Sequence, residues 1–452
     1  MDIRIVGQFS KAFGSKSVWI TLNVMFLIGS AGSAYSRNFM QLIASQAISG
    51  LGGGLSTLVN IMLHDTVPSD KLGMYMSYSN IILMISFIFG APCGGYISDT
   101  FGWRYCYMIA ILPLTLILCL SIYHLKSYDD APIATATKPT LFTDKLRMVD
   151  LVGITLLSIP TVSFVCAISF GGTVYAWSSP IIIAAFAVTL LGYILFFLHQ
   201  KRWAQYPLLP RALIHDRNFI ISCICCLLMH VITGGATATG PQYLMGSLHF
   251  SMADAGRCSL LATPGVLAGY YLSGRYLKHA GRFSRLMLTC IAMQTLSWST
   301  MYFWTNGDIY SAVTLFLYIL GGIGCGALMV SLAVAAISTL PTELGGTALS
   351  MFYLATNVGT TSGIACSSAI IQRTLKVLLP TRIDGPDAAK VIEFIITSIR
   401  RVKELSPEIQ QIVADVIAIA VQHVISSFIL CLVFMFFITL CMQDVSLKKR
   451  KA

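Results

Sequence analysis

Long apolar segments recur along the whole chain, and they restrict its fold more than any other feature. A helix needs about 20 mainly apolar residues to cross the hydrocarbon core of a bilayer. Twelve segments meet this requirement: residues 17–36, 38–62, 73–98, 104–124, 150–171, 179–199, 217–240, 254–274, 286–304, 309–337, 346–371 and 419–442. Several contain glycine and serine, which allow helices in a bilayer to pack closely. The sequence therefore predicts an all-α, polytopic membrane protein.

The composition excludes several classes of soluble protein. Hydrophobic residues make up 56% of the chain and charged residues only 11%, whereas about 25% of a soluble domain is charged. A cytosolic enzyme, a secreted disulfide scaffold and a disordered chain are excluded on this ground. A β-barrel is also excluded, because its strands would be about 10 residues long with alternating polarity. The net charge of +11 lies in short loops between apolar runs, so we expect no nucleic-acid partner.

Nothing in the sequence indicates a metal site or a cofactor. The only cluster of cysteines is Cys223, Cys225 and Cys226, and on a helix these side chains point in different directions. We expect them to pack as small apolar residues. A membrane-embedded enzyme would need a paired nucleophile and base, or a His/Asp cluster at one membrane depth, and the sequence offers neither. We therefore expect a protein that is not an enzyme.

The distribution of basic residues predicts the orientation. If the N-terminus is cytoplasmic, the inner segments hold twenty Lys and Arg residues and the short outer segments hold three, Arg37, Arg104 and Arg257. The other seven lie in one long outer loop, 372–418, and long loops escape the positive-inside rule. Both termini are therefore predicted to face the cytoplasm. In the outer loop, Ser406 and Pro407 are typical of an N-cap and a first helical residue, and the helix that begins there is expected to run into the last span.

Glycine features repeat at a nearly constant offset. Gly7 and Gly14, followed by Lys16, correspond to Gly274 and Gly281, followed by Arg282, at an offset of 267. The string Gly50, Gly52 and Gly54 corresponds to Gly322, Gly324 and Gly326 at an offset of 272, and Gly73 and Gly90 correspond to Gly346 and Gly363 at 273. Because these strings lie inside apolar helices, they favour close helix packing over a dinucleotide-binding turn. A parallel repeat of this kind is typical of transporters that hold substrate between two helix bundles.

Several motifs resemble the signatures of major facilitator transporters. The loop from Gly7 to Lys16 is similar to the signature between the second and third helices, and Ser49–Gly54 is similar to the fourth-helix motif. Gly90, Pro92, Gly94 and Gly95, followed by Gly102, Trp103 and Arg104, resemble the antiporter motif of the fifth helix and the turn after it. Asp65 to Asn80 is similar to the fourth-to-fifth helix region of the fourteen-span drug:proton antiporter branch. Within that branch the chain looks most like the yeast vacuolar basic amino acid transporters.

The resemblance implies a major facilitator fold with twelve helices, equivalent to helices 3–14 of a fourteen-span transporter, so that the first two helices are missing. It implies four regions: an incomplete N-terminal bundle (1–124), a cytoplasmic linker (125–149), an extra central helix pair (150–199) and a C-terminal bundle (200–452) with the outer loop 372–418. Two departures from the family pattern stand out. The Asp of the loop signature is replaced by Lys11, and the fourth-helix Arg, which the resemblance links to proton coupling, is replaced by Gln46.

Polar residues inside a bilayer are candidates for function because their burial there is costly. A carboxylate at Asp65 can attract a cationic substrate or carry a proton; the alternative is a structural pairing with Lys71. His230 lies in the middle of a span and suits a proton relay; the alternative is a neutral histidine hydrogen-bonded between helices. Four further side chains are candidates for lining the substrate cavity, with simple packing as the alternative for each: Asn80, Gln46, Tyr353 and Asn357. Trp103 and Arg104 are predicted to hold the outer turn.

The leading hypothesis is therefore a monomeric, proton-coupled antiporter of the vacuolar membrane that moves Lys, Arg and His into the vacuole. A plasma-membrane multidrug:proton exporter of the same branch has the same fold, and fold does not determine substrate. A different alternative is a truncated, transporter-like protein that no longer transports and acts as a sensor or scaffold. The missing helices and Gln46 favour that alternative.

Overall fold

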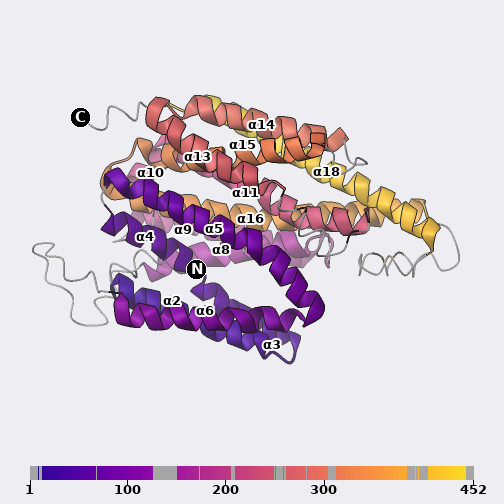
Figure 1. Ribbon diagram of the computed structural model, residues 1–452, viewed down its shortest axis with the longest axis horizontal. Coiled ribbons are helices and arrows are strands. Elements are labelled where there is room, and N and C mark those ends of the chain that lie inside the picture. Colours follow the sequence, from indigo (N-terminus) through magenta and orange to yellow (C-terminus); the bar gives the residue numbers. More distant parts are fainter. Residues whose placement is uncertain are drawn as a thin grey trace, which may run out of the picture. The chain divides into compact units, whose positions relative to one another are not determined.

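The computed structural model describes residues 13–67, 69–125, 150–172, 174–204, 209–248, 261–280, 282–303, 312–383 and 406–443, together with Phe9, Phe250, Cys258, Ile392 and Ile395. These residues form helices and, apart from one isolated bridge between Gly171 and Tyr175, no β-structure. The helices, labelled in Figure 1, belong to two compact units. The first comprises residues 1–158, 195–211 and 343–354, and the second comprises residues 159–194, 212–342 and 355–452.

The first unit contains five complete helices. They are α2 (Ser15–Ala34), α3 (Phe39–Gly52), α4 (Leu55–Thr66), α5 (Ser69–Thr100) and α6 (Trp103–His124). Helix α2 packs against both α3 and α6, and α5 packs against α4 and α6. A small core of Val18, Leu22 and Leu58 is buried between α2 and α4. The predicted linker 125–149 lies outside the described residues, apart from Leu125.

One predicted span of the first unit is not a single helix. The segment 38–62 divides into α3 and α4, with a turn at Gly53 and Gly54 between them. The Gly53 N–H bonds to the carbonyl of Gly50 at 3.1 Å, an i to i−3 bond that tightens the end of α3. The prediction of one continuous span was wrong here, because consecutive glycines permit a break that an apolar run does not reveal.

The second unit contains five helices that lie wholly within it. It holds α11 (Arg217–Gly246), α13 (Thr263–Ala280), α14 (Ser284–Phe303), α15 (Ala312–Ser338) and α18 (Pro407–Leu440). It shares three helices with the first unit, α8 (Leu151–Phe170), α9 (Pro180–Arg202) and α16 (Thr342–Leu378), and also holds most of the short α10 (Arg211–His215) and the 3₁₀ turn η2 (Leu379–Thr381). Helix α18 packs against α11 and α14, and α15 packs against α11, α13 and α14.

Glycines bring the helices of the second unit close together. A Cβ atom added to Gly269 of α13 would lie 2.9 Å from the backbone nitrogen of Ala327 in α15, and one added to Gly322 of α15 would meet the backbone of α13. Gly359 and Gly363 of α16 face the backbone of α11 in the same way. Any larger side chain at these positions would push two helices apart. The predicted role of the glycine string around Gly322 in close helix packing is therefore confirmed.

The internal repeat extends to individual contacts. In the first unit, a Cβ on Gly52 of α3 would lie 2.6 Å from Phe26 N in α2. In the second, a Cβ on Gly324 of α15, at the predicted offset of 272, would lie 2.9 Å from Cys290 O in α14. Corresponding glycines thus allow close approach of α3 to α2 and of α15 to α14. Gly50 differs, because a Cβ there would meet none of the described atoms within 4 Å, so its role in packing stays a prediction.

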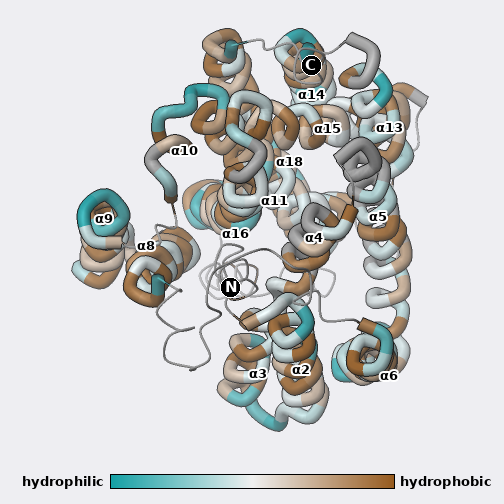
Figure 2. Tube along the Cα trace, turned by 90° about the vertical axis from the view of Figure 1, so that its left-hand side faces the viewer, coloured by the Kyte–Doolittle hydropathy of each residue, from teal (hydrophilic) through white to brown (hydrophobic). Residues whose placement is uncertain are grey.

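Each predicted span falls on helix in the part of it that the structure describes, and the segment 38–62 falls on two helices. Seven of the described helices are long and apolar enough to cross a membrane: α2, α6, α8, α9, α11, α15 and α18. The other five predicted spans fall on α3–α4, α5, α13, α14 and α16. Figure 2 shows hydrophobic residues on α2, α3 and α6. Large apolar side chains of α6, such as Leu112 and Leu116, are exposed, as expected where lipid replaces water as the solvent. The fold is thus that of an all-α polytopic membrane protein.

Helix α16 extends further into the segment 372–418 than its predicted end at residue 371. Helix α16 continues to Leu378, and α18 begins at Pro407 with Ser406 as its N-cap and runs to Leu440. The prediction of a helix that begins at Ser406 and Pro407 and continues into the last span is confirmed. Proline is well placed at the first turn because its missing N–H would have no partner within the helix.

Candidate functional site

The loop-signature residues connect the start of α2 to the end of α6. Gly14 caps α2 with a φ of 86°, a conformation that favours glycine. The Lys16 ammonium donates to the Ile122 carbonyl at 3.1 Å, and the Trp19 indole N–H donates to the Ser121 hydroxyl at 2.8 Å. Carbonyls in the last turn of a helix have no partner within that helix. The motif therefore fastens two helices together at the end expected to face the cytoplasm.

The residues after α5 connect the opposite ends of the same two helices. Gly102 precedes α6 with a φ of 99°. The Arg104 guanidinium donates to the Ser36 carbonyl at 3.0 Å and lies 4.5 Å from the centre of the Trp103 ring. Ser36 follows the end of α2, so Arg104 holds that end against α6. Arg104 therefore holds this turn, as predicted, and the position of the turn on the outer side stays a prediction.

A neutral polar cluster lies between α2, α3 and α6. The Gln46 amide nitrogen is 3.1 Å from the Ser33 hydroxyl and 2.9 Å from the Tyr107 hydroxyl. Ser33 is fully buried, whereas Gln46 is exposed. The predicted alternative for Gln46, an interhelical contact, is therefore present. Tyr107 had no place in the sequence prediction, because a tyrosine in an apolar run looks like any other packed aromatic residue.

The other candidate residues of the first unit lie on α4, on α5 and in the turn between α3 and α4. Asp65 lies on α4 and Asn80 on α5, and both side chains lie outside the described part of the structure. Gly90, Gly94 and Gly95 lie on α5, where an added Cβ would meet none of the described atoms within 4 Å. Pro92 lies within the same helix. No helix in the described part of the chain requires the small size of these three glycines. Gly54 is a buried residue of the turn between α3 and α4.

His230 lies on α11 beside α16, and its ring has a defined orientation. Its Nδ1 atom is 2.8 Å from the carbonyl of Cys226, one turn earlier in the same helix. A carbonyl only accepts hydrogen bonds, so Nδ1 carries a hydrogen in the neutral as well as the charged ring. The basic nitrogen of the neutral ring is therefore Nε2. No bond from Nε2 to a described residue is present, so this atom is available to a proton or to a substrate.

Neighbouring residues fix the position of His230. The Cys226 thiol lies 3.2 Å from the Thr356 hydroxyl of α16. Gly359, about one turn further along α16, would place an added Cβ 2.9 Å from the His230 Cβ. The predicted alternative, a histidine bonded between helices, does not describe this geometry, because the ring bonds to its own helix. The structure thus brings together His230, Cys226 and Thr356, of which the sequence singled out only His230 as a candidate.

The remaining candidates of the second half are dispersed. Tyr353 and Asn357 lie one turn apart on α16; Tyr353 stacks edge-on against Phe352, with ring centres 5.8 Å apart, and Asn357 is exposed. Of the repeated glycine loop, Gly274 lies on α13, where an added Cβ would meet no described atom within 4 Å, and Arg282 is exposed. Gly7 and Gly281 lie outside the described residues. The described residues include no group of three metal-ligating side chains.

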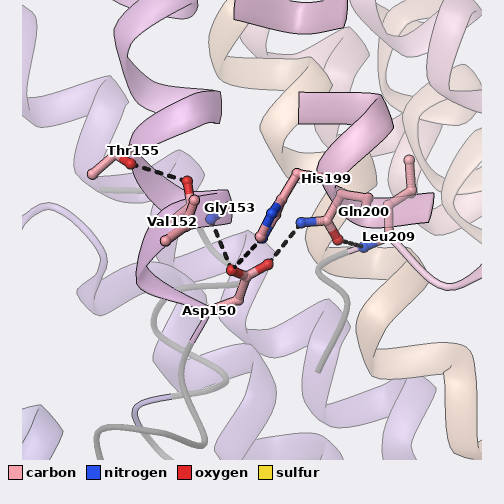
Figure 3. Close-up of polar contacts among 7 residues, drawn as sticks. All are labelled: Asp150, Val152, Gly153, Thr155, His199, Gln200 and Leu209. Carbon is pink, nitrogen blue, oxygen red and sulfur yellow. Dashed lines mark hydrogen bonds and ion pairs between the residues drawn. The ribbon is translucent and has the colours of Figure 1, made fainter. Parts of the chain in front are cut away.

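A buried carboxylate that the sequence prediction missed lies where α8 begins and α9 ends (Figure 3). Asp150 accepts from the backbone N–H of Gly153 at 2.8 Å, contacts His199 Nε2 at 2.9 Å and accepts from the Gln200 amide at 2.8 Å. Its side chain is only 8% exposed. Gln200 in turn accepts from the Leu209 N–H at 3.1 Å. The group therefore joins two helix ends and the segment that leads toward α10.

We expect Asp150→Ala to destabilise the protein by about 1–3 kcal/mol, because it removes a helix cap and leaves buried donors on Gln200 and Gly153 without an acceptor. Thermal unfolding of the purified protein in detergent measures the loss. Asp99→Ala is the matched control: Asp99 is exposed in the last turn of α5, where a negative charge is unfavourable to the helix dipole. Equal unfolding temperatures for the two variants would contradict an anchoring role for Asp150.

Comparison with known proteins identifies the family. The Major Facilitator Superfamily model matches residues 5–364. Among solved structures, an auto-inhibited POT family peptide transporter superposes over 98% of this chain and 88% of its own, with a TM-score of 0.57 and 15% sequence identity. At that identity the likeness concerns the fold alone.

Fungal transporters are similar over most of the chain. The vacuolar membrane amino acid uptake transporter fnx2 of Schizosaccharomyces pombe is 27% identical over 91% of this chain and 70% of its own length. The vacuolar basic amino acid transporter 2 of Saccharomyces cerevisiae is 25% identical over 84% of this chain and 81% of its own. The multidrug resistance protein fnx1 of S. pombe is 24% identical over 90% of this chain and 76% of its own length.

The matched region covers only part of several relatives. It spans 62%, 66% and 64% of the length of three further fungal transporters from Phoma, Phaeosphaeria nodorum and Pyricularia grisea. The family match nevertheless covers well over half of this chain, and its relatives are transporters rather than enzymes. The chain therefore belongs to the Major Facilitator Superfamily and is a multi-pass membrane transport protein.

Proposed function

We propose that the chain is a proton-coupled antiporter that moves Lys, Arg and His across the vacuolar membrane into the lumen. The observation that carries this proposal is its similarity, over 91% and 84% of its length, to two yeast proteins named as vacuolar amino acid transporters. The position of His230 supports it, since Nε2 is an available basic nitrogen inside a bundle of apolar helices. Both termini face the cytoplasm in this proposal, and the transporter acts as a monomer.

The mechanism needs a titratable group that takes either a proton or the cationic substrate. On the lumenal side, where protons are abundant, the carboxylate of Asp65 binds a proton and releases the amino acid. On the cytoplasmic side it loses the proton and attracts the ammonium or guanidinium of the next substrate. His230 provides a second group that accepts a proton while the substrate site changes from facing one side of the membrane to facing the other. Protons leave the acidic lumen down their gradient as substrate enters it.

Uptake of labelled lysine, arginine and histidine into vacuolar vesicles tests the proposal. Vesicles from yeast cells without their own basic amino acid carriers, with and without this chain, are compared under an imposed proton gradient. We expect uptake only where the chain is present, and Asp65→Asn is expected to reduce it at least tenfold, about 1.4 kcal/mol of coupling. Asp99→Asn serves as the control for removing an exposed carboxylate. Full uptake by the Asp65 variant would exclude Asp65 as the coupling group.

A second candidate function, multidrug export, is favoured by the similarity to fnx1, which is named a multidrug resistance protein. Drug sensitivity of cells that carry the chain separates the two functions. Basic amino acid uptake without drug resistance supports the first, and drug resistance without uptake supports the second. If the chain is present in the membrane and gives neither, the non-transporting alternative is favoured.

A further inference from the structure

The amide orientation of Gln46 follows from its two neighbours. The Ser33 hydroxyl donates its only hydrogen to the carbonyl of Gly29 at 2.8 Å, so toward Gln46 it can only accept. The nitrogen of the Gln46 amide must therefore face Ser33. The same nitrogen is 2.9 Å from the Tyr107 hydroxyl. An amide nitrogen has two hydrogens, and each of them goes to one of these oxygens.

Two hydrogen-bonding groups remain unused in this arrangement. With both N–H groups engaged, Gln46 presents its carbonyl oxygen Oε1, which only accepts. Tyr107 accepts from Gln46, so its own O–H hydrogen remains to be donated. Neither group bonds to another described residue. One fixed acceptor and one fixed donor therefore lie side by side, held in place by the buried Ser33.

The surroundings indicate that these groups meet a polar ligand. Gln46 is in the middle of α3 and exposed, and an unpaired polar group is costly in hydrocarbon, so such groups face water or a ligand. Arg104 lies one turn before Tyr107 on α6 and already donates to the Ser36 carbonyl. Its positive charge favours an anionic group on the Tyr107 side of the pair. The Gln46 carbonyl favours a cationic N–H donor on the other side.

We propose that Gln46 and Tyr107 bind the backbone of a free α-amino acid: Gln46 Oε1 accepts from the α-ammonium, and the Tyr107 O–H donates to the α-carboxylate. This inference rests on the proposed function only for the substrate class, which is amino acids. It does not depend on which amino-acid side chain is transported or on proton coupling. It gives the neutral side chain of Gln46 a role in binding. A neutral acceptor suits a cationic substrate better than a fixed positive charge would.

Binding to the purified full chain in lipid nanodiscs tests this pair. Labelled lysine is competed with cadaverine, which lacks the carboxylate, and with Nα-acetyl-lysine, which lacks the α-ammonium. We expect Tyr107→Phe to weaken lysine binding about tenfold to 100-fold and to leave the affinity for cadaverine unchanged. Gln46→Met, which keeps the side-chain length, is expected to weaken lysine to the same degree and to leave Nα-acetyl-lysine unchanged.

Tyr105→Phe is the matched control, because Tyr105 is an exposed tyrosine on the same helix, 5.9 Å from the Phe101 ring. It is expected to bind lysine like the unmodified chain. Wild-type affinity in the Tyr107 or Gln46 variants, or an equal loss of all three ligands, would overturn the inference. The proposed function fails separately if the chain binds leucine as well as lysine, or binds lysine without exchanging it for protons.

Discussion

Gly269→Leu is expected to prevent most of the protein from folding correctly, whereas Gly274→Leu, five residues further along α13, is expected to have little effect. Gly269 faces the backbone of Ile323 and Ala327 in α15, so a side chain there has no room unless the two helices separate. Gly274 has none of the described atoms within 4 Å of an added Cβ. Overpacking of this kind costs about 1–3 kcal/mol or more.

The comparison isolates packing from helix propensity. Both substitutions replace glycine by leucine within one helix, and both remove the flexibility of glycine, which favours the variants by up to about 1 kcal/mol. Fluorescence-detected size-exclusion chromatography after heating measures the folded fraction. For Gly269→Leu only, we expect the folded peak to be weak and to disappear at a lower heating temperature than for the unmodified chain. Equal behaviour of the two variants would show that α13 and α15 do not pack through these glycines.

His230→Gln is expected to abolish proton-driven uptake while the protein still folds and binds lysine. Glutamine is polar and of similar length but does not titrate, so it removes the available Nε2 as a proton acceptor. We expect uptake under a proton gradient to fall at least tenfold, equivalent to about 1.4 kcal/mol. Lysine binding in the absence of a gradient is expected to change less than threefold, or about 0.6 kcal/mol.

His423→Gln is the matched control for this variant. His423 lies on α18 of the same unit, and its Nδ1 is 3.3 Å from the Thr374 hydroxyl. It is exposed, and the mechanism gives it no part in coupling. Uptake by His423→Gln is expected to match that of the unmodified chain. If both variants retain uptake, His230 has no role in coupling; if both lose it, the loss does not report on His230 specifically and the assignment is rejected.

The sequence predicts the helices well because their formation depends on local properties. Apolar length places each span, and Ser406 followed by Pro407 locates the start of α18 to the residue. The break between α3 and α4 could not be predicted, since Gly53 and Gly54 are also compatible with a continuous, closely packed helix. Gly50 shows the same limit, because its neighbours depend on which helices surround it.

The candidate site is less predictable because its geometry depends on contacts between distant segments. Asp150 and His199 are 49 residues apart, and the only local signal was an aspartate three residues before Gly153, typical of a helix cap. Tyr107 meets Gln46 across 61 residues, and its neighbours along α6 give no sign of that contact. His230 could be recognised because an imidazole inside an apolar run is rare, but its bond to Cys226 could not.

The most direct test of proton-coupled exchange uses the purified chain in liposomes with an acidic interior and a pH-sensitive dye inside. Labelled lysine is added outside, and lysine entry and interior pH are followed together. Antiport predicts that lysine accumulates against its gradient and that the interior becomes less acidic at the same rate. Both changes should be absent with His230→Gln. Lysine entry without any change in the interior pH, or no entry at all by a folded protein, would contradict the proposed function.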